Sequence, residues 1–118
     1  MKFVIDTKTV KNYDADLIDI CKQRLLERVS NYTYEELRIM KLNDYIMHNK
    51  YMVDGRVFIV FKTVVVKQQV RMLLELTEDS LILVEFYVKK KNKQKYYNDF
   101  KARANTYCRC TTGLSTRA

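Results

Sequence analysis

Residues 57–88, VFIVFKTVVVKQQVRMLLELTEDSLILVEFYV, carry the clearest fold signal in this sequence. It contains three runs rich in β-branched, aromatic and leucine residues, at 57–66, 69–76 and 81–88, and such composition favours strands. The runs are separated by Lys67-Gln68 and by residues 77–80, and connections of that length are typical of hairpins. We therefore expect three consecutive strands that form an antiparallel meander.

Two helices are predicted between an N-terminal strand and this meander. Phe3-Val4-Ile5 indicates a short apolar strand that pairs beside the meander. A helix capped by Asp14 or Asp16 follows, because apolar residues recur at every fourth position, namely Leu17, Cys21, Leu25 and Val29. Thr33 and Glu36 have the spacing of a capping box, which starts a second helix with the inward residues Leu37, Ile39, Met40, Leu42 and Ile46.

The rest of the pattern completes a single α+β domain. Asp54-Gly55 marks a turn before the meander, and residues 95–105 predict a last helix with Tyr96, Phe100 and Ala104 on one face. The order β-α-α-β-β-β-α describes a small antiparallel sheet packed against an N-terminal helical hairpin, with a C-terminal basic helix. A chain of 118 residues with 47% hydrophobic composition suits one domain. We expect that domain to span residues 1–105 and residues 106–118 to form a flexible tail.

Positive charge is concentrated in the last third of the chain. Residues 1–85 contain thirteen Lys and Arg and thirteen Asp and Glu, whereas residues 86–118 contain nine and one, so the net charge of +8 lies in the second part. The densest part ends in Tyr96-Tyr97, and aromatic rings beside ammonium groups favour stacking on unpaired bases and contact with phosphate. We predict a nucleic-acid partner that contacts Lys67, Lys89, Lys90, Lys91, Lys93, Lys95, Lys101 and Arg103.

The sequence gives no sign of export, a membrane span or a cofactor. The first six residues lack the apolar stretch of a signal peptide, and the longest apolar run, residues 57–61, is far shorter than the roughly 18 residues that a membrane span needs. Three cysteines are an odd number and imply no disulfide framework. Cys108-Arg109-Cys110 has only Cys21 and His48 to complete a zinc site. We expect a cytoplasmic protein without metal, other cofactor or membrane partner.

The order and length resemble the RelE/ParE superfamily of small toxins, in particular its HigB-like and phage-derived members. In those members a strand with an Arg among apolar residues is followed by a turn, an apolar strand, a Lys-Lys pair with another Lys behind it, and a helix with an Ala and a basic residue. The segments that match here are residues 70–76 with Arg71, residues 81–87, Lys89-Lys90 with Lys93, and residues 99–103. The resemblance extends over residues 2–105.

The resemblance implies an endoribonuclease that cleaves mRNA, usually on the ribosome, and is silenced by a cognate antitoxin. Attack of a ribose 2′-OH on the adjacent phosphate needs a proton acceptor, a proton donor for the leaving 5′ oxygen, and cations near the phosphorane charge. The chain has one His, which excludes a two-histidine mechanism. The resemblance assigns Arg71 to the scissile phosphate, and Tyr96 or Tyr97 to stacking or proton transfer. It assigns backbone contacts and charge stabilisation to Lys89, Lys90, Lys91 and Lys93, with one of these lysines as the proton acceptor.

Other functions fit the same sequence. A ParE-like relative would have no nuclease activity and would bind a protein target such as DNA gyrase. A non-enzymatic nucleic-acid-binding protein, for example one encoded by a phage, would use the basic C-terminal part for charge and stacking alone. In the plainest interpretation, residues 89–95 are a solvated connection between a strand and a helix, and Arg71 points outward from a half-buried strand.

Overall fold

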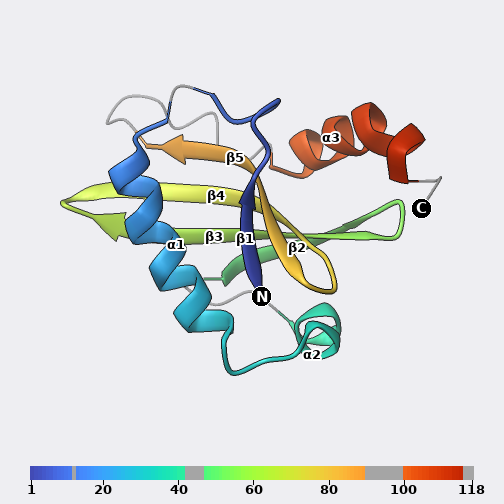
Figure 1. The fold of residues 1–118 in the computed structure, drawn as a ribbon, viewed down its shortest axis with the longest axis horizontal. Helices are drawn as coiled ribbons and strands as arrows, with labels where there is room; N and C mark the ends of the chain where they lie inside the picture. Colours follow the sequence, from blue (N-terminus) through green and yellow to red (C-terminus); the bar gives the residue numbers. More distant parts are fainter. Residues whose placement is uncertain (12, 42–46, 90–99, 116–118) are drawn as a thin grey trace.

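One mixed five-stranded sheet forms the centre of the structure, and different helices cover its two faces (Figure 1). The computed structural model describes residues 1–11, 13–41, 47–89 and 100–115. The elements within these residues are β1 (Lys2–Ile5), α1 (Ala15–Val29), α2 (Tyr34–Ile39), β2 (Met47–Val53), β3 (Arg56–Val65), β4 (Gln68–Leu76), β5 (Ser80–Val88) and α3 (Phe100–Ser115). The predicted α+β class is confirmed.

The predicted meander is present as β3, β4 and β5. β3 and β4 pair antiparallel along their whole length, with Val57 opposite Leu76 and Val65 opposite Gln68. β4 and β5 also pair antiparallel, with one irregularity in the register. The β3–β4 turn is Val66-Lys67, one residue earlier than predicted.

β1 makes the sheet mixed. It lies at the edge beside β5 and pairs with it in parallel, with Phe3 opposite Leu81. The backbone N–H of Lys2 also donates a hydrogen bond to the carbonyl of Asp79 at 2.8 Å. The strand predicted at residues 3–5 is confirmed, but the prediction of a wholly antiparallel sheet is wrong. Parallel pairing requires a long connection between the two strands. The residues between β1 and β5 let β5 lie beside β1 and run in the same direction.

The second helix is shorter than predicted, and a strand follows it. α2 begins with the predicted capping box and ends at Ile39, because the backbone of the next residue, Met40, is extended. Ile39 is 74% exposed, so its predicted inward position is wrong, whereas Leu37 is buried as predicted. β2 pairs antiparallel with β3 through a tight Asp54-Gly55 turn in which both residues have positive φ, so the sheet holds one strand more than predicted.

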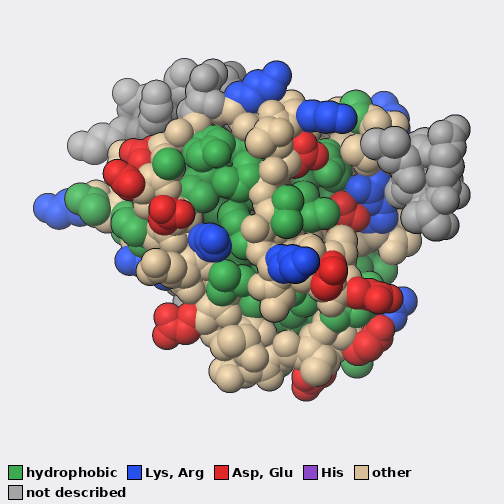
Figure 2. All heavy atoms as spheres, viewed as in Figure 1, with side chains coloured by type: hydrophobic (Ala, Val, Ile, Leu, Met, Phe, Trp, Pro, Cys, Tyr) green, Lys and Arg blue, Asp and Glu red, His purple; other side chains and the backbone are tan. Residues whose placement is uncertain are grey.

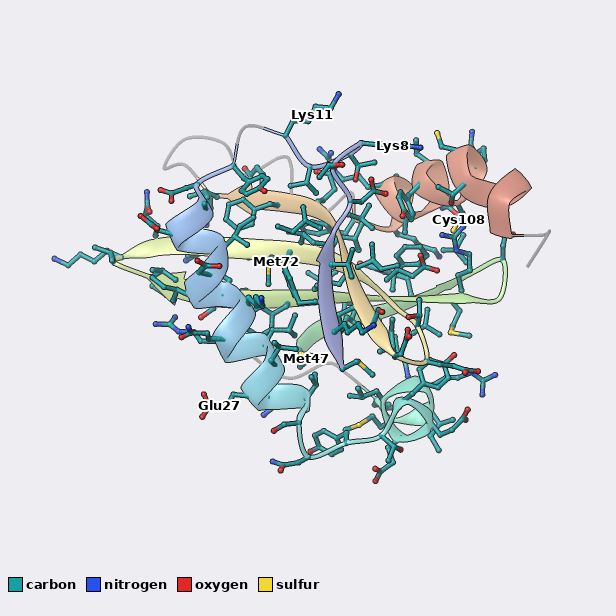
Figure 3. All side chains as sticks on the ribbon, in the orientation of Figure 1. Lys8, Lys11, Glu27, Met47, Met72 and Cys108 are labelled. Atoms are coloured by element: carbon teal, nitrogen blue, oxygen red, sulfur yellow. The ribbon has the colours of Figure 1, made fainter. Side chains whose placement is uncertain are left out.

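The two faces of the sheet have separate apolar cores. α1 covers one face with Leu17, Ile18, Cys21, Leu25 and Val29, which pack with sheet residues that include Met47 and Met72 (Figure 3). α3 covers the other face with Phe100, Ala104, Tyr107 and Cys108, which pack on Val53, Phe58, Val60, Leu73 and Val84. Because side chains alternate along a strand, β3 and β4 contribute successive residues to the two cores.

A polar contact fixes α3 to the sheet. The Arg56 guanidinium donates two hydrogen bonds to the Glu75 carboxylate, at 2.7 and 2.8 Å, and a third to the Thr111 hydroxyl at 2.6 Å. It also lies over the ring of Tyr107 at 5.3 Å from the centroid. These contacts reach into residues 106–115, which are helical, so the prediction of a flexible tail from residue 106 is wrong for that part. Residues 116–118 lie outside the described part of the chain.

None of the helices in the described residues combines the length and the apolar content needed to cross a membrane.

Replacing Glu75 with Gln tests the contact that holds α3. The side chains of Arg56 and Glu75 are only 16% and 9% exposed, so Glu75→Gln leaves a largely buried guanidinium without its carboxylate. We expect the free energy of unfolding, measured in urea, to fall by about 3–5 kcal/mol. The matched control is Glu85→Gln, which breaks the Arg103–Glu85 pair, where exposures are 37% and 30%. The control should lose at most about 1 kcal/mol, and equal losses would contradict the structural role of Glu75.

Candidate nucleic-acid interface

A row of three polar side chains crosses the sheet beyond the edge of the α3 core. Lys62 on β3 lies opposite Arg71 on β4, and Arg71 lies opposite Tyr87 on β5. Two residues along the same strands, Val60 and Leu73 belong to the α3 core, so strand alternation places Lys62 and Arg71 on that same face. Cross-strand neighbours of this kind have Cβ atoms about 4.5–5.5 Å apart. We call these three residues the cationic row.

The row has a buried centre and more exposed flanks. Arg71 is 8% exposed, whereas Lys62 and Tyr87 are both partly exposed. Arg71 therefore does not point outward into solvent from a half-buried strand, which was the plain alternative for it. Lys62 and Tyr87 are thus more accessible to a ligand on this face than Arg71.

The same face continues toward the β3–β4 turn. Val64 lies opposite Gln69, and both side chains are exposed. Lys89, just after β5, donates its backbone N–H to the Gln69 carbonyl at 2.8 Å. In Figure 1 this end of the sheet, with its turn, lies at the left of the view, and α3 lies toward the opposite end. We call this region the hairpin end. It consists of the cationic row, Val64, Gln69, Lys89 and the turn Val66-Lys67.

The hairpin end carries positive charge, and the strand segments that form it contain no acidic residue. It contains Lys62, Lys67, Arg71 and Lys89, and the sequence has no Asp or Glu between residues 55 and 74 or between 86 and 89. Burial lowers the pKa of the Lys62 ammonium, and the nearby positive charge of Arg71 lowers it further. The concentration of cations attracts phosphate.

Two carboxylates on the α3 side, those of Glu75 and Glu85, have basic partners in the structure. Glu75 is bound by Arg56, and Glu85 accepts a hydrogen bond from Arg103 at 2.8 Å. Arg103, which was predicted to contact nucleic acid, is therefore held in an ion pair on α3. On the face that α1 covers, Lys and Arg side chains are interspersed with Asp and Glu (Figure 2).

The structure brings together only part of the predicted site. Arg71 and Lys89 both lie at the hairpin end, Lys67 is exposed in its turn, and Lys101 is exposed on α3. The remaining candidates lie outside the described residues, namely Lys90, Lys91, Lys93, Lys95, Tyr96 and Tyr97. Sequence reasoning missed Lys62 and Tyr87. The feature that identifies both residues is the register of the strands, which places Lys62 and Tyr87 on either side of Arg71.

The cationic row combines three chemical groups that phosphate chemistry uses. An amine with a lowered pKa is a weaker base, but a larger fraction of it is uncharged near neutral pH and so available to accept a proton. A guanidinium stays protonated and matches the geometry of two phosphate oxygens. A phenol donates a hydrogen bond or stacks on a base. Within the described parts of the chain, no three His, Cys, Asp or Glu side chains gather as metal ligands would.

A groove beside α3 borders the cationic row along β5. It has a volume of about 460 Å³ and is lined by residues that include Thr9, Val84, Glu85, Arg103, Thr106 and Cys110. Glu85 lies two residues before Tyr87 on β5, so the groove opens next to the row. Its charged lining is the Glu85–Arg103 pair.

Comparison with known proteins identifies no relative of this chain, because no protein-family model, no curated protein and no solved structure matches it.

The coupling between Lys62 and Arg71 can be measured directly. Replacing Arg71 with Met removes the positive charge beside Lys62, so we expect the pKa of Lys62 to rise toward the ordinary lysine value, followed by the ¹³Cε shift in an NMR titration. Lys50 is the internal control, because burial alone lowers its pKa. A Lys62 pKa that stays unchanged in Arg71→Met would contradict the coupling, provided the Lys50 pKa is also unchanged.

Proposed function

We propose that the protein is a metal-independent endoribonuclease of the RelE type, and that it binds and cleaves mRNA at the hairpin end. One observation carries the proposal: the strand register places a lysine of lowered pKa, a buried arginine and a tyrosine side by side. The resemblance in the sequence already assigned Arg71 to a phosphate. Lys62 and Tyr87 give that arginine the neighbours that a cleavage reaction needs.

Each member of the row has a role in the proposed reaction. Lys62, in its uncharged form, takes the proton of the ribose 2′-OH, whose oxygen then bonds to the adjacent phosphorus. Arg71 stabilises the negative charge that develops on the phosphorane oxygens. Tyr87 donates a proton to the 5′ oxygen as the P–O5′ bond breaks. The products are a 2′,3′-cyclic phosphate and a 5′-hydroxyl, so atoms and protons balance without a metal.

The lowered pKa of Lys62 favours the role of proton acceptor. An ordinary lysine is almost fully charged at neutral pH, and each unit by which its pKa falls increases the uncharged fraction about tenfold. Burial and Arg71 both act in that direction. Arg71 would thus have two roles. It would bind the phosphate, and its charge would lower the pKa of Lys62.

The cellular context of the proposal comes from the resemblance. A RelE-type toxin acts on mRNA at the ribosome in the cytoplasm and is silenced by an antitoxin. A net charge of +8 makes an acidic antitoxin the complementary partner. Covering the hairpin end would block the row and neutralise its cations.

A non-enzymatic nucleic-acid-binding protein is the second candidate. The observation that favours it is the 8% exposure of Arg71, because phosphate binding by Lys62, Lys67 and Lys89 requires no direct access to that guanidinium. Such a protein would bind RNA with a strong dependence on salt and would leave it intact. A ParE-like action on a protein target such as DNA gyrase would also leave RNA intact.

The proposal is tested by induced expression in a bacterial host, with growth and primer-extension mapping of cellular mRNA as readouts. We expect arrest with discrete new cuts for the wild type. Loss of a general base costs about 10²–10⁴ in rate, and loss of a transition-state cation costs about 10²–10³, so Lys62→Met and Arg71→Met should both abolish cutting. Lys11→Met is the matched control, because Lys11 is exposed on the loop before α1 (Figure 3).

The other outcomes separate the alternatives. Arrest without cuts in the wild type would contradict the nuclease and favour a protein target. Normal growth, together with salt-dependent RNA binding by the purified protein, would favour the non-enzymatic candidate. Cutting that survives in Lys62→Met at an equal protein level would remove Lys62 from the reaction.

A further inference from the structure

The turn between β3 and β4 has an unfavourable sequence for its geometry. Val66 and Lys67 are the two turn residues, and both have positive φ, at 48° and 64°. Two-residue hairpin turns of this kind favour Asn-Gly or Asp-Gly, because only such residues adopt the left-handed region easily. The β2–β3 turn follows that rule with Asp54-Gly55. A β-branched residue at Val66 is a genuine conformational outlier.

Packing gives no reason for a valine at this position. The Val66 side chain is 86% exposed, which is the greatest exposure among the large exposed apolar residues of the described chain. It therefore gains little from burial that would offset the backbone strain. Strained residues persist where the surroundings hold them and are concentrated at functional sites. The strain and the exposure of Val66 therefore indicate that Val66 and its neighbour Lys67 contact another molecule.

The charge of the hairpin end indicates the kind of molecule. Lys67 stands at the tip, and Lys62, Arg71 and Lys89 lie behind it on the same end of the sheet, with no acidic residue in the intervening strand segments. An apolar side chain next to a lysine suits a nucleotide, whose base or ribose offers an apolar surface and whose phosphate offers a negative charge.

We propose that Val66 and Lys67 form a second RNA contact, distal to the cationic row. This inference rests on the proposed function, because it takes the row as the place of the scissile phosphate. Lys62 and Val66 are separated by four residues of extended chain, or roughly 13 Å. Each strand of duplex DNA advances about 3.4 Å per nucleotide, so an RNA strand stacked in the same way would reach from the row to the tip over about four nucleotides.

The path between the two contacts crosses exposed residues of the same face. Val64 is 44% exposed and lies between Lys62 and the tip, opposite the exposed Gln69. Arg24 on α1 supports this part of β3 from the other face, through hydrogen bonds to the Thr63 hydroxyl at 2.8 Å and the Val64 carbonyl at 2.6 Å. The hairpin is therefore braced on the α1 side while its α3 side carries the proposed RNA path.

The test compares two RNA lengths in a double variant, Val66→Asn/Lys67→Gln. The probes are a 12-nucleotide single strand and a trinucleotide, both with 2′-O-methyl ribose, which removes the attacking hydroxyl. The longer probe is followed by fluorescence anisotropy across salt concentrations and the shorter one by NMR titration. For the 12-mer we expect affinity to fall roughly fivefold and the salt slope to fall by about 0.7. Affinity for the trinucleotide should stay unchanged.

Stability provides the control for folding. Asn tolerates the left-handed region, so the double variant should melt roughly 4 °C higher than the wild type while it binds the 12-mer more weakly. Asp54→Asn in the β2–β3 turn is the matched control, and it should leave affinity for both probes unchanged.

The outcomes distinguish this inference from the proposed function. Wild-type affinity of the double variant for the 12-mer, with weakened binding by Lys62→Met, would overturn the distal contact and leave the row as the RNA site. Equal losses on both probes would also overturn it, because a distal contact acts only on the longer strand. If the wild type binds neither probe, the proposed function fails, and the distal contact fails with it.

Discussion

The antiparallel register between β3 and β4 determines which side chains enter each apolar core and which form the cationic row. Both strands are apolar on their two faces in the centre of the sheet, so apolar patterning alone distinguishes the faces weakly. Their charged residues, by contrast, share the α3 face, where they are Arg56, Lys62, Arg71 and Glu75. A shift of one strand by one residue would move charges into the α1 core, at a large desolvation cost. The polar residues therefore specify the register that the apolar residues stabilise.

Local signals in the sequence predicted the elements that depend on nearby residues. The meander, the first helix, the Thr33–Glu36 capping box and the Asp54-Gly55 turn are all present. β2 was missed because its residues, MHNKYMV, alternate poorly, and it becomes a strand through pairing with β3. The length of α3 was underestimated because its second half is fixed by a contact 55 residues away in sequence, between Arg56 and Thr111.

The candidate site shows how a small error in a turn affects a functional prediction. Arg71 was identified from its place in an apolar strand, but its partner Lys62 was not. With a turn at Lys67-Gln68, antiparallel pairing would place Lys62 opposite Leu73; the observed turn at Val66-Lys67 places it opposite Arg71. Strand propensity does not resolve that difference, because the turn residues have unusual conformations for their types. The hypothesis for residues 90–97 stays a prediction.

The parallel pairing of β1 with β5 has a consequence for how the protein is made. Within the described sheet, β1 has its neighbour β5 roughly 80 residues later in the chain, so it cannot pair until those residues have been synthesised. β5 also supplies Tyr87, the last member of the cationic row. Closure of the sheet and completion of the row therefore both depend on the synthesis of β5. A chain that ends before β5 would hold neither, so under the proposed function a nascent protein would lack the complete row with which to cleave RNA.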